Sequence, residues 1–124
     1  MLFDILENLE WYVGLYPSLK RVIGIMDRSL PYQDEPGVHT VDGISYEVQS
    51  YLTGSDSLIR QSELCQMHCI LEGEELLSLE ENESPSVVIM ATEGRFVILH
   101  EGESYKNSMQ MANDGVVKKV IFNL

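Results

Sequence analysis

Basic residues are scarce in this sequence: it has 8 Lys and Arg against 20 Asp and Glu, which gives a formal net charge of −12 at pH 7. Binding to a nucleic-acid backbone or to an anionic membrane requires clustered Lys and Arg that displace counterions. The charge therefore argues against both kinds of partner. The simplest interpretation of the acidic excess is a solvated surface that keeps the protein soluble.

Long hydrophobic runs are also missing. The apolar residues near the start are interrupted by Asp4, Glu7 and Glu10, so this segment lacks the basic start and unbroken apolar core of a secretory signal and is too polar to span a bilayer. A cytoplasmic protein is the default expectation. A length of 124 residues with 44% hydrophobic residues predicts a single domain, residues 1–124, with a modest core.

Cysteine is rare, with only Cys65 and Cys69 present. On a strand, residues four apart are separated by about 13 Å between Cα atoms, which is far beyond disulfide range. A zinc site of the finger type would need further thiolates or histidines at short spacing. We therefore expect two reduced, packed thiols.

Helical spacing of apolar residues occurs over residues 18–28, through Leu19, Val22, Ile23 and Met26. Leu30-Pro31 is expected to end this helix, because the residue before a proline favours extended backbone. The chain that follows has the alternation and the turn residues of β-strands. Strands are predicted at 38–41, 44–52, 64–71, 75–79, 87–91, 95–99, 105–111 and 116–122, with a polar loop at 80–84.

Asp42-Gly43 is the clearest turn signal, because this pair readily takes the positive φ angles of a type I′ hairpin. In the strand that follows, one face is expected to be core and the other to meet water or a pocket. The expected core face holds Ile44, Tyr46, Val48 and Leu52, and the other face holds Ser45, Glu47, Gln49 and Tyr51. Many short strands at regular spacing predict a sandwich or barrel.

Several segments follow the order of a known family. They are the opening residues 1–27, the Pro-Gly, Asp-Gly and Tyr-x-Thr pattern within 35–53, LEGEE at 71–75, the acidic turn within 94–111, and VKKVIFNL at 117–124. Together they resemble the sugar-associated YhcH/YjgK/YiaL family. The resemblance implies a mainly β fold, a double-stranded β-helix or cupin-like jelly roll with one N-terminal α-helix.

The same resemblance points to a metal site whose ligands have changed. Family members carry a Glu-x-His pair, then Asp-x-Gln, and a histidine two residues after a Gly-acid turn. The matching positions here hold Ile59 and Gln61, Gln66 and His68, and Tyr105. A transition metal needs about three or four converging donors, so no metal cofactor is expected. The alternative is a rebuilt, zinc-like site that uses His68 with Glu47 or Glu103.

The polar residues at these positions are expected to line a pocket. In the family's register, Gln66 and His68 share one strand face and Tyr105 faces them from another hairpin. Amides, carboxylates and imidazoles bind sugar hydroxyls, and a Tyr ring packs against a pyranose. In the alternative interpretation these groups bond only to one another or to trapped water. The further residues expected in the wall are Glu47, Gln49, Tyr51, Gln61 and Lys119.

Better known family members are sialic-acid anomerases and the small subunit of a β-galactosidase. The resemblance thus implies carbohydrate metabolism, with a small sugar or sugar acid as ligand. Anomerisation needs an acid and a base beside the ring oxygen and the anomeric hydroxyl; His68 is the candidate base and Tyr105 or Glu47 the candidate acid.

A non-catalytic role is the competing interpretation. The chain would then be an accessory subunit beside the large subunit of a glycosidase, or an interaction module, with subunit contacts through Trp11, Tyr12 and Tyr16. A homodimer is a further possibility for a small jelly roll. A structural domain without any ligand is the third alternative.

Overall fold

The structure is a computed structural model that describes residues 1–54, 59–82, 84–109 and 115–124. Its helical elements are the 3-10 helix η1 (Leu6–Tyr12) and the α-helices α1 (Leu19–Asp27) and α2 (Leu30–Gln33). The strands are β1 (Leu2–Ile5), β2 (Gly37–Val41), β3 (Ile44–Leu52), β4 (Arg60–Gln61), β5 (Gln66–Glu72), β6 (Glu74–Glu81), β7 (Ser84–Thr92), β8 (Arg95–Leu99), β9 (Ser104–Met109) and β10 (Val116–Asn123). No helix in these ranges is long and apolar enough to cross a membrane.

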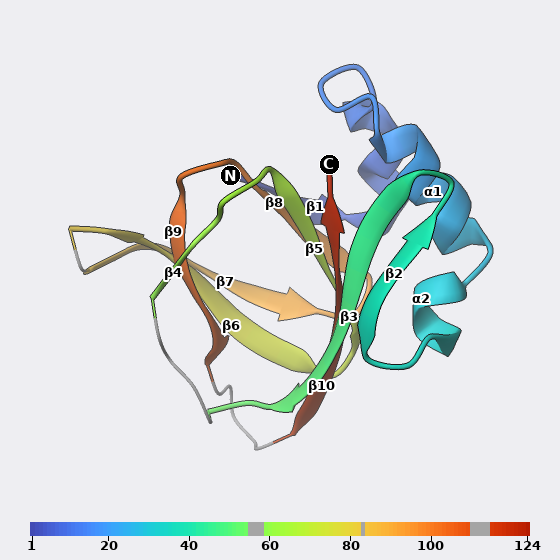
Figure 1. The fold of residues 1–124 in the computed structure, drawn as a ribbon. Coiled ribbons are helices and arrows are strands. Elements are labelled where there is room, and N and C mark those ends of the chain that lie inside the picture. Colours follow the sequence, from blue (N-terminus) through green and yellow to red (C-terminus); the bar gives the residue numbers. More distant parts are fainter. Residues whose placement is uncertain (55–58, 83, 110–114) are drawn as a thin grey trace.

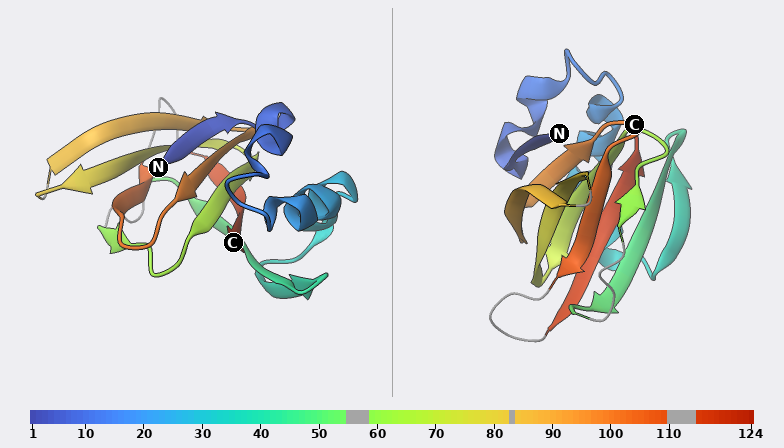
Figure 2. Two further views of the ribbon diagram at one scale, coloured as in Figure 1. Left: turned by 90° about the horizontal axis from the view of Figure 1, so that it is seen from above. Right: turned by 90° about the vertical axis from the view of Figure 1, so that its left-hand side faces the viewer.

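The described strands form two antiparallel sheets. One has six strands in the order β1-β8-β5-β10-β3-β2, and the other has four in the order β4-β9-β6-β7. In Figure 1 the helices lie on one side of the six-stranded sheet, and β6, β7 and β9 lie on its other side. The views in Figure 2 show the same arrangement from above and from the side. The six-stranded sheet is therefore a middle layer with two buried faces.

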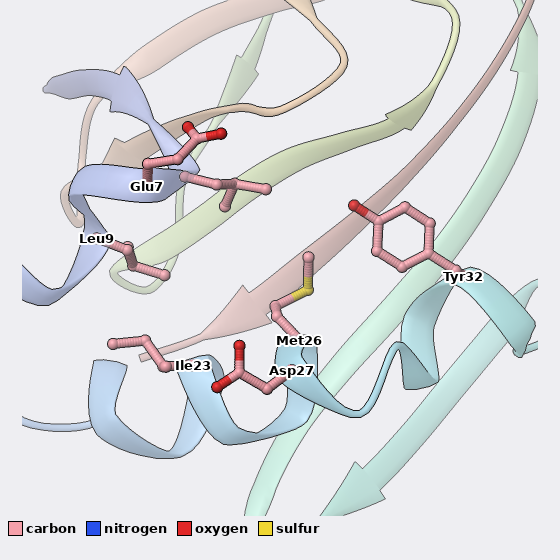
Figure 3. Close-up of a pocket in the computed structure, with 7 residues that line it drawn as sticks. Glu7, Leu9, Ile23, Met26, Asp27 and Tyr32 are labelled. Carbon is pink, nitrogen blue, oxygen red and sulfur yellow. The ribbon is translucent and has the colours of Figure 1, made fainter.

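The helices cover one face of this sheet. α1 packs beside η1, and a shallow pocket of about 270 Å³ opens between them (Figure 3). Its walls are mostly apolar, and two carboxylates, Glu7 and Asp27, lie at its edge. None of the residues expected to bind a ligand lines this pocket.

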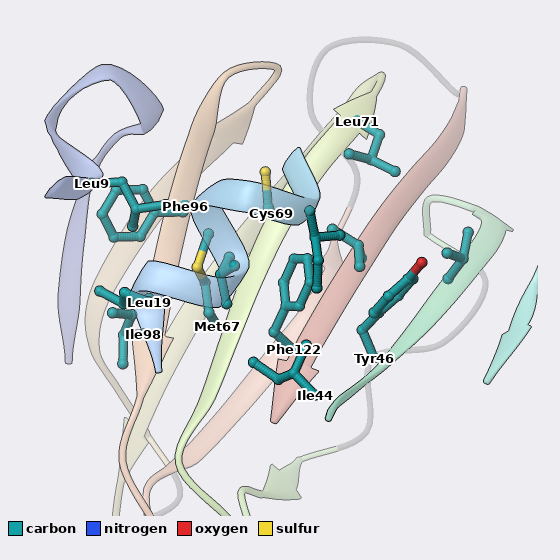
Figure 4. Close-up of a cluster of buried hydrophobic side chains, with 14 residues drawn as sticks. Leu9, Leu19, Ile44, Tyr46, Met67, Cys69, Leu71, Phe96, Ile98 and Phe122 are labelled. Carbon is teal, nitrogen blue, oxygen red and sulfur yellow. The ribbon is translucent and has the colours of Figure 1, made fainter. Parts of the chain in front are cut away.

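The main hydrophobic core lies between the helices and the six-stranded sheet (Figure 4). Alternate residues of β10, Val120 and Phe122, point into it and are fully buried. The Phe122 ring packs on Tyr46 of β3, with ring centroids 5.1 Å apart. Because side chains alternate along a strand, Lys119 and Ile121, on either side of Val120, face the other sheet.

Two smaller apolar clusters lie between the sheets. One contains Leu77, Val97, Leu99 and Tyr105, and the other contains Ile70, Ala91 and Val117. His68 and Lys119, on the same sheet face, are buried polar residues. The interior between the sheets is therefore apolar with a polar middle, whereas the core under the helices is mainly apolar.

Turn chemistry explains the connections of these strands. Asp42 and Gly43 both have positive φ, 53° and 77°, which confirms the predicted type I′ hairpin. Gly73 joins β5 to β6 with φ +81°, and a Cβ placed there would lie 2.4 Å from the Val116 carbonyl oxygen. Glycine is required at this turn by both its conformation and its close approach to β10.

Three details of the predicted elements were wrong. Leu52 is 58% exposed instead of on the core face, because it lies at the end of β3. The predicted loop at 80–84 is a shorter turn, since Glu81 pairs with Ser84 and the two strands continue to it. The first helix ends before Leu30-Pro31 as expected, but strands do not follow at once, because Pro31 lies in the first turn of a second short helix, α2, a position where proline is tolerated.

The remaining expectations for local structure agree with the structure. α1 falls within the predicted helix, and each predicted strand is found with small shifts of its ends. Residues 110–111 of the predicted strand 105–111 lie outside the described residues. Both cysteines are free thiols, and burial raises the pKa of Cys69 to about 12.

Candidate functional site

A buried ion pair lies at the centre of the polar interior. The Lys119 ammonium is 3.2 Å from Glu75 Oε1, and the two side chains are 0% and 1% exposed. The Tyr51 hydroxyl donates a hydrogen bond to Glu75 Oε2, and Lys119 Nζ lies 5.6 Å from the centre of the Tyr51 ring. Buried charges are tolerated when they are paired in this way.

His68 extends this cluster towards β9. Its Nδ1 is 3.3 Å from Lys119 Nζ. An ammonium only donates hydrogen bonds, so Nδ1 accepts and the proton of the neutral ring is on Nε2. Nε2 is buried without a partner among the described residues, and the ring meets Tyr105 edge-on at 5.4 Å between centroids.

Burial determines the charge states of this cluster. It lowers the pKa of His68 well below its usual value, and the neighbouring Lys119 lowers it further. Burial also lowers the pKa of Lys119, while Glu75 acts in the opposite direction. The pKa of Tyr51 is raised by burial and by Glu75. The cluster therefore holds a neutral imidazole beside an ion pair.

The His68 environment predicts a pH-dependent stability. Unfolded His68 takes up a proton below about pH 6.5, whereas the folded side chain resists protonation to lower pH. The unfolded state then binds more protons, so the free energy of unfolding falls as the pH drops below about 6.5. Between about pH 7.5 and 5.5, we expect wild type to lose about 1 kcal/mol more than His68→Gln does.

Urea unfolding at the two pH values measures this difference. The control is His39→Gln on β2, which removes an imidazole elsewhere and leaves His68 in place; it should keep the wild-type loss. An identical loss in wild type and His68→Gln would show that the buried imidazole does not resist protonation.

An open pocket adjoins the cluster. Its volume is about 240 Å³, and its walls come from β2, β3, β5, β9 and β10. Ile121 in its wall is the Cα partner of both Glu47 and His68. Tyr105 both lines the pocket and contacts the His68 ring. The lining residues are Val38, Ser45, Tyr46, Glu47, Gln49, Gln66, Tyr105, Ile121 and Asn123.

The structure brings most of the sequence-predicted residues together in two layers. Glu47, Gln49, Gln66 and Tyr105 line the pocket. Tyr51, His68 and Lys119 form the cluster behind it. Gln61 is separate: it is exposed on β4 and donates a hydrogen bond to the Gly102 carbonyl oxygen.

Glu75 and Asn123 are among the residues of this arrangement that sequence reasoning missed. In the sequence analysis, Glu75 was used only as the last residue of the LEGEE motif, yet it is the buried partner of Lys119. Its alternation with Leu77 and Leu79 was a usable signal, because period-two spacing places all three on one strand face. Asn123 follows the last predicted strand and accepts a hydrogen bond of 3.1 Å from the Gln66 amide.

The cluster does not fit the metal site implied by the resemblance. Within the described ranges, no three His, Cys, Asp or Glu side chains are grouped to hold an ion. Near His68, a cationic ammonium occupies the Nδ1 side, and the Glu75 oxygens are bonded to Lys119 and Tyr51. A second cation at this place would meet the Lys119 charge at close range, which is unfavourable.

Comparisons with solved structures identify the architecture. Hydroxypropylphosphonic acid epoxidase (HppE) from S. wedmorenis matches with a TM-score of 0.56 and 18% identity, over 65% of this chain and 43% of that one. HppE with Co(II) and Tris buffer matches with a TM-score of 0.60 and 15% identity, over 73% of this chain and 55% of that one. Protein NMB1881 from Neisseria meningitidis matches with a TM-score of 0.57 and 12% identity, over 73% and 82% of the two chains.

The fold is a cupin-like jelly roll. This confirms the expected fold class, and at such low identity the likeness extends to the fold alone. The chain spans about half the length of the HppE chains that it matches. No family model matches the sequence, and no curated protein matches it.

Proposed function

We propose that this cupin-like protein binds a small sugar or sugar acid in the pocket between β3, β5, β9 and β10. The observation that carries the proposal is the polar wall, in which Gln49, Gln66 and Asn123 provide amides, Glu47 a carboxylate and Tyr105 an aromatic ring. Sugar hydroxyls both donate and accept hydrogen bonds, so they are matched by this mixture of groups. A volume of about 240 Å³ is below the usual range for pockets that hold drug-sized ligands, so it restricts the ligand to one about the size of a monosaccharide.

Calorimetric titration with a panel of monosaccharides, amino sugars and sugar acids tests this proposal. For a sugar that binds, Gln49→Ala should weaken affinity about tenfold, because one hydrogen bond within the pocket is lost. The matched control is Gln33→Ala, at the exposed end of α2, which should bind as wild type. The absence of binding by every member of the panel would contradict the proposal.

The resemblance to the YhcH/YjgK/YiaL family supports a role in carbohydrate metabolism within this proposal. Binding is favoured over anomerisation by one observation: the lone pair of His68 Nδ1 already accepts from Lys119, so the expected base is engaged. Exchange NMR of the α and β anomers of a bound sugar separates the two roles, because an anomerase accelerates their interconversion.

An accessory role beside a glycosidase is the second candidate. It is favoured by two large apolar side chains near the N-terminus, Trp11 and Leu15, each 70% exposed. The other aromatics considered for this contact pack inward: Tyr12 lies edge-on to Phe96 and Tyr16 stacks on His100. In this role the isolated chain would bind none of the sugars in the panel.

A further inference from the structure

We infer that the pocket selects amino sugars and uncharged sugars over sugar acids, and that Glu47 determines this preference. The inference rests on the proposed sugar-binding function and narrows its ligand class. It follows from the distribution of charge around the pocket.

Among the described residues that line the pocket, Glu47 is the only charged one. It is exposed on β3, and no described residue forms an ion pair with it. An unpaired carboxylate at the wall attracts a ligand ammonium and repels a ligand carboxylate. The net charge of −12 adds a general repulsion of anions.

Neither nearby cation lines the pocket, although Lys119 lies close enough behind the wall to interact electrostatically with Glu47. The Lys119 ammonium is fully buried behind the wall and paired with Glu75. Arg60, the Cα partner of Tyr105, lies on β4 outside the lining and has an interaction of its own. A sugar carboxylate in the pocket would therefore find no cation among the described lining residues.

The rest of the polar wall is neutral. Gln66 donates to Asn123 Oδ1, which orients both amides and leaves the Gln66 oxygen and the Asn123 amide hydrogens for a ligand. Gln49 adds a third amide. These groups bind hydroxyls without regard to ligand charge, so discrimination by charge falls to Glu47.

Titration with glucose, glucosamine and glucuronate tests the inference, because the three share a pyranose ring and differ in charge. At low ionic strength we expect glucosamine to bind about fivefold more tightly than glucose, and glucuronate about fivefold more weakly, for a charge about 4 Å from Glu47. Added salt should reduce both differences. Glu47→Gln keeps the side-chain shape and should bring the three affinities within about twofold of one another.

The matched control is Glu74→Gln, an exposed carboxylate on β6 outside the pocket. It makes the same change in net charge and should retain the wild-type order of affinities. Equal affinities in wild type, or tighter binding of glucuronate, would overturn the inference while leaving sugar binding intact. Failure of all three sugars, and of the wider panel, would instead overturn the proposed function and this inference with it.

Discussion

Replacing Lys119 with Met is expected to lower the free energy of unfolding by about 3–5 kcal/mol, because the buried Glu75 carboxylate would lose the ammonium with which it is paired. Both side chains are almost fully buried, so water cannot take the place of the lost ammonium. The His68 ring would also lose the hydrogen bond to its Nδ1. The loss arises mainly from the charge that remains, rather than from a large net value of the pair itself.

Urea unfolding of a double-mutant cycle measures this effect. Adding Glu75→Gln to Lys119→Met removes the negative charge of Glu75 and keeps an amide oxygen near Tyr51. At least half of the lost stability should therefore return. Lys118→Met is the matched control; among the described residues it loses a hydrogen bond to the Tyr32 carbonyl, and it should cost about 1 kcal/mol. Additive losses in the cycle would show that the two side chains are not coupled.

Replacing Gly73 with Ala should destabilise the fold by about 2–5 kcal/mol. A positive φ of 81° costs an L-residue about 1–2 kcal/mol. The new Cβ would also lie 2.4 Å from the Val116 carbonyl oxygen and 3.3 Å from the Val117 Cα. Because these are backbone atoms, the start of β10 must shift, and such overpacking adds about 1–3 kcal/mol.

Gly94→Ala separates the two contributions. Gly94 has nearly the same φ, 82°, and nothing lies within 4 Å of a Cβ built there. Only the conformational cost of about 1–2 kcal/mol should appear in its urea midpoint. Equal losses in the two variants would show that β10 accommodates the added methyl group without strain.

Local sequence signals predict much of this fold. The Asp42-Gly43 turn and the alternation of Ile44, Tyr46 and Val48 correctly give the first hairpin and its core face. η1 was not predicted, because a 3-10 helix has no 3.6-residue repeat of apolar positions. Leu52 lies on the same face of β3 as the core residues, but the helices that cover this face do not extend to the end of the strand.

The candidate site is less predictable than the fold, because it depends on which strands meet. The alternation of side chains along a strand predicts that Gln49 and Tyr51 share one face of β3. The pairing of Gln49 with Lys119, in contrast, depends on the register of the sheet, which the sequence does not give. Nothing local reveals that Lys119 would be fully buried, while Lys118 beside it reaches the Tyr32 carbonyl. Gln61 was placed by family register alone, and the structure puts it on a strand that does not border the pocket.

The two buried faces of the six-stranded sheet have a consequence for the evolution of this protein. Along β10, Val120 and Phe122 belong to the core under the helices, and Ile121 belongs to the wall of the pocket. Substitutions at alternate residues of this strand therefore act on opposite faces of the sheet, and Tyr46 of β3 links the two faces because it belongs to the core and also lines the pocket. Ligand preference can drift through the pocket-facing positions while the helix-facing positions preserve the fold.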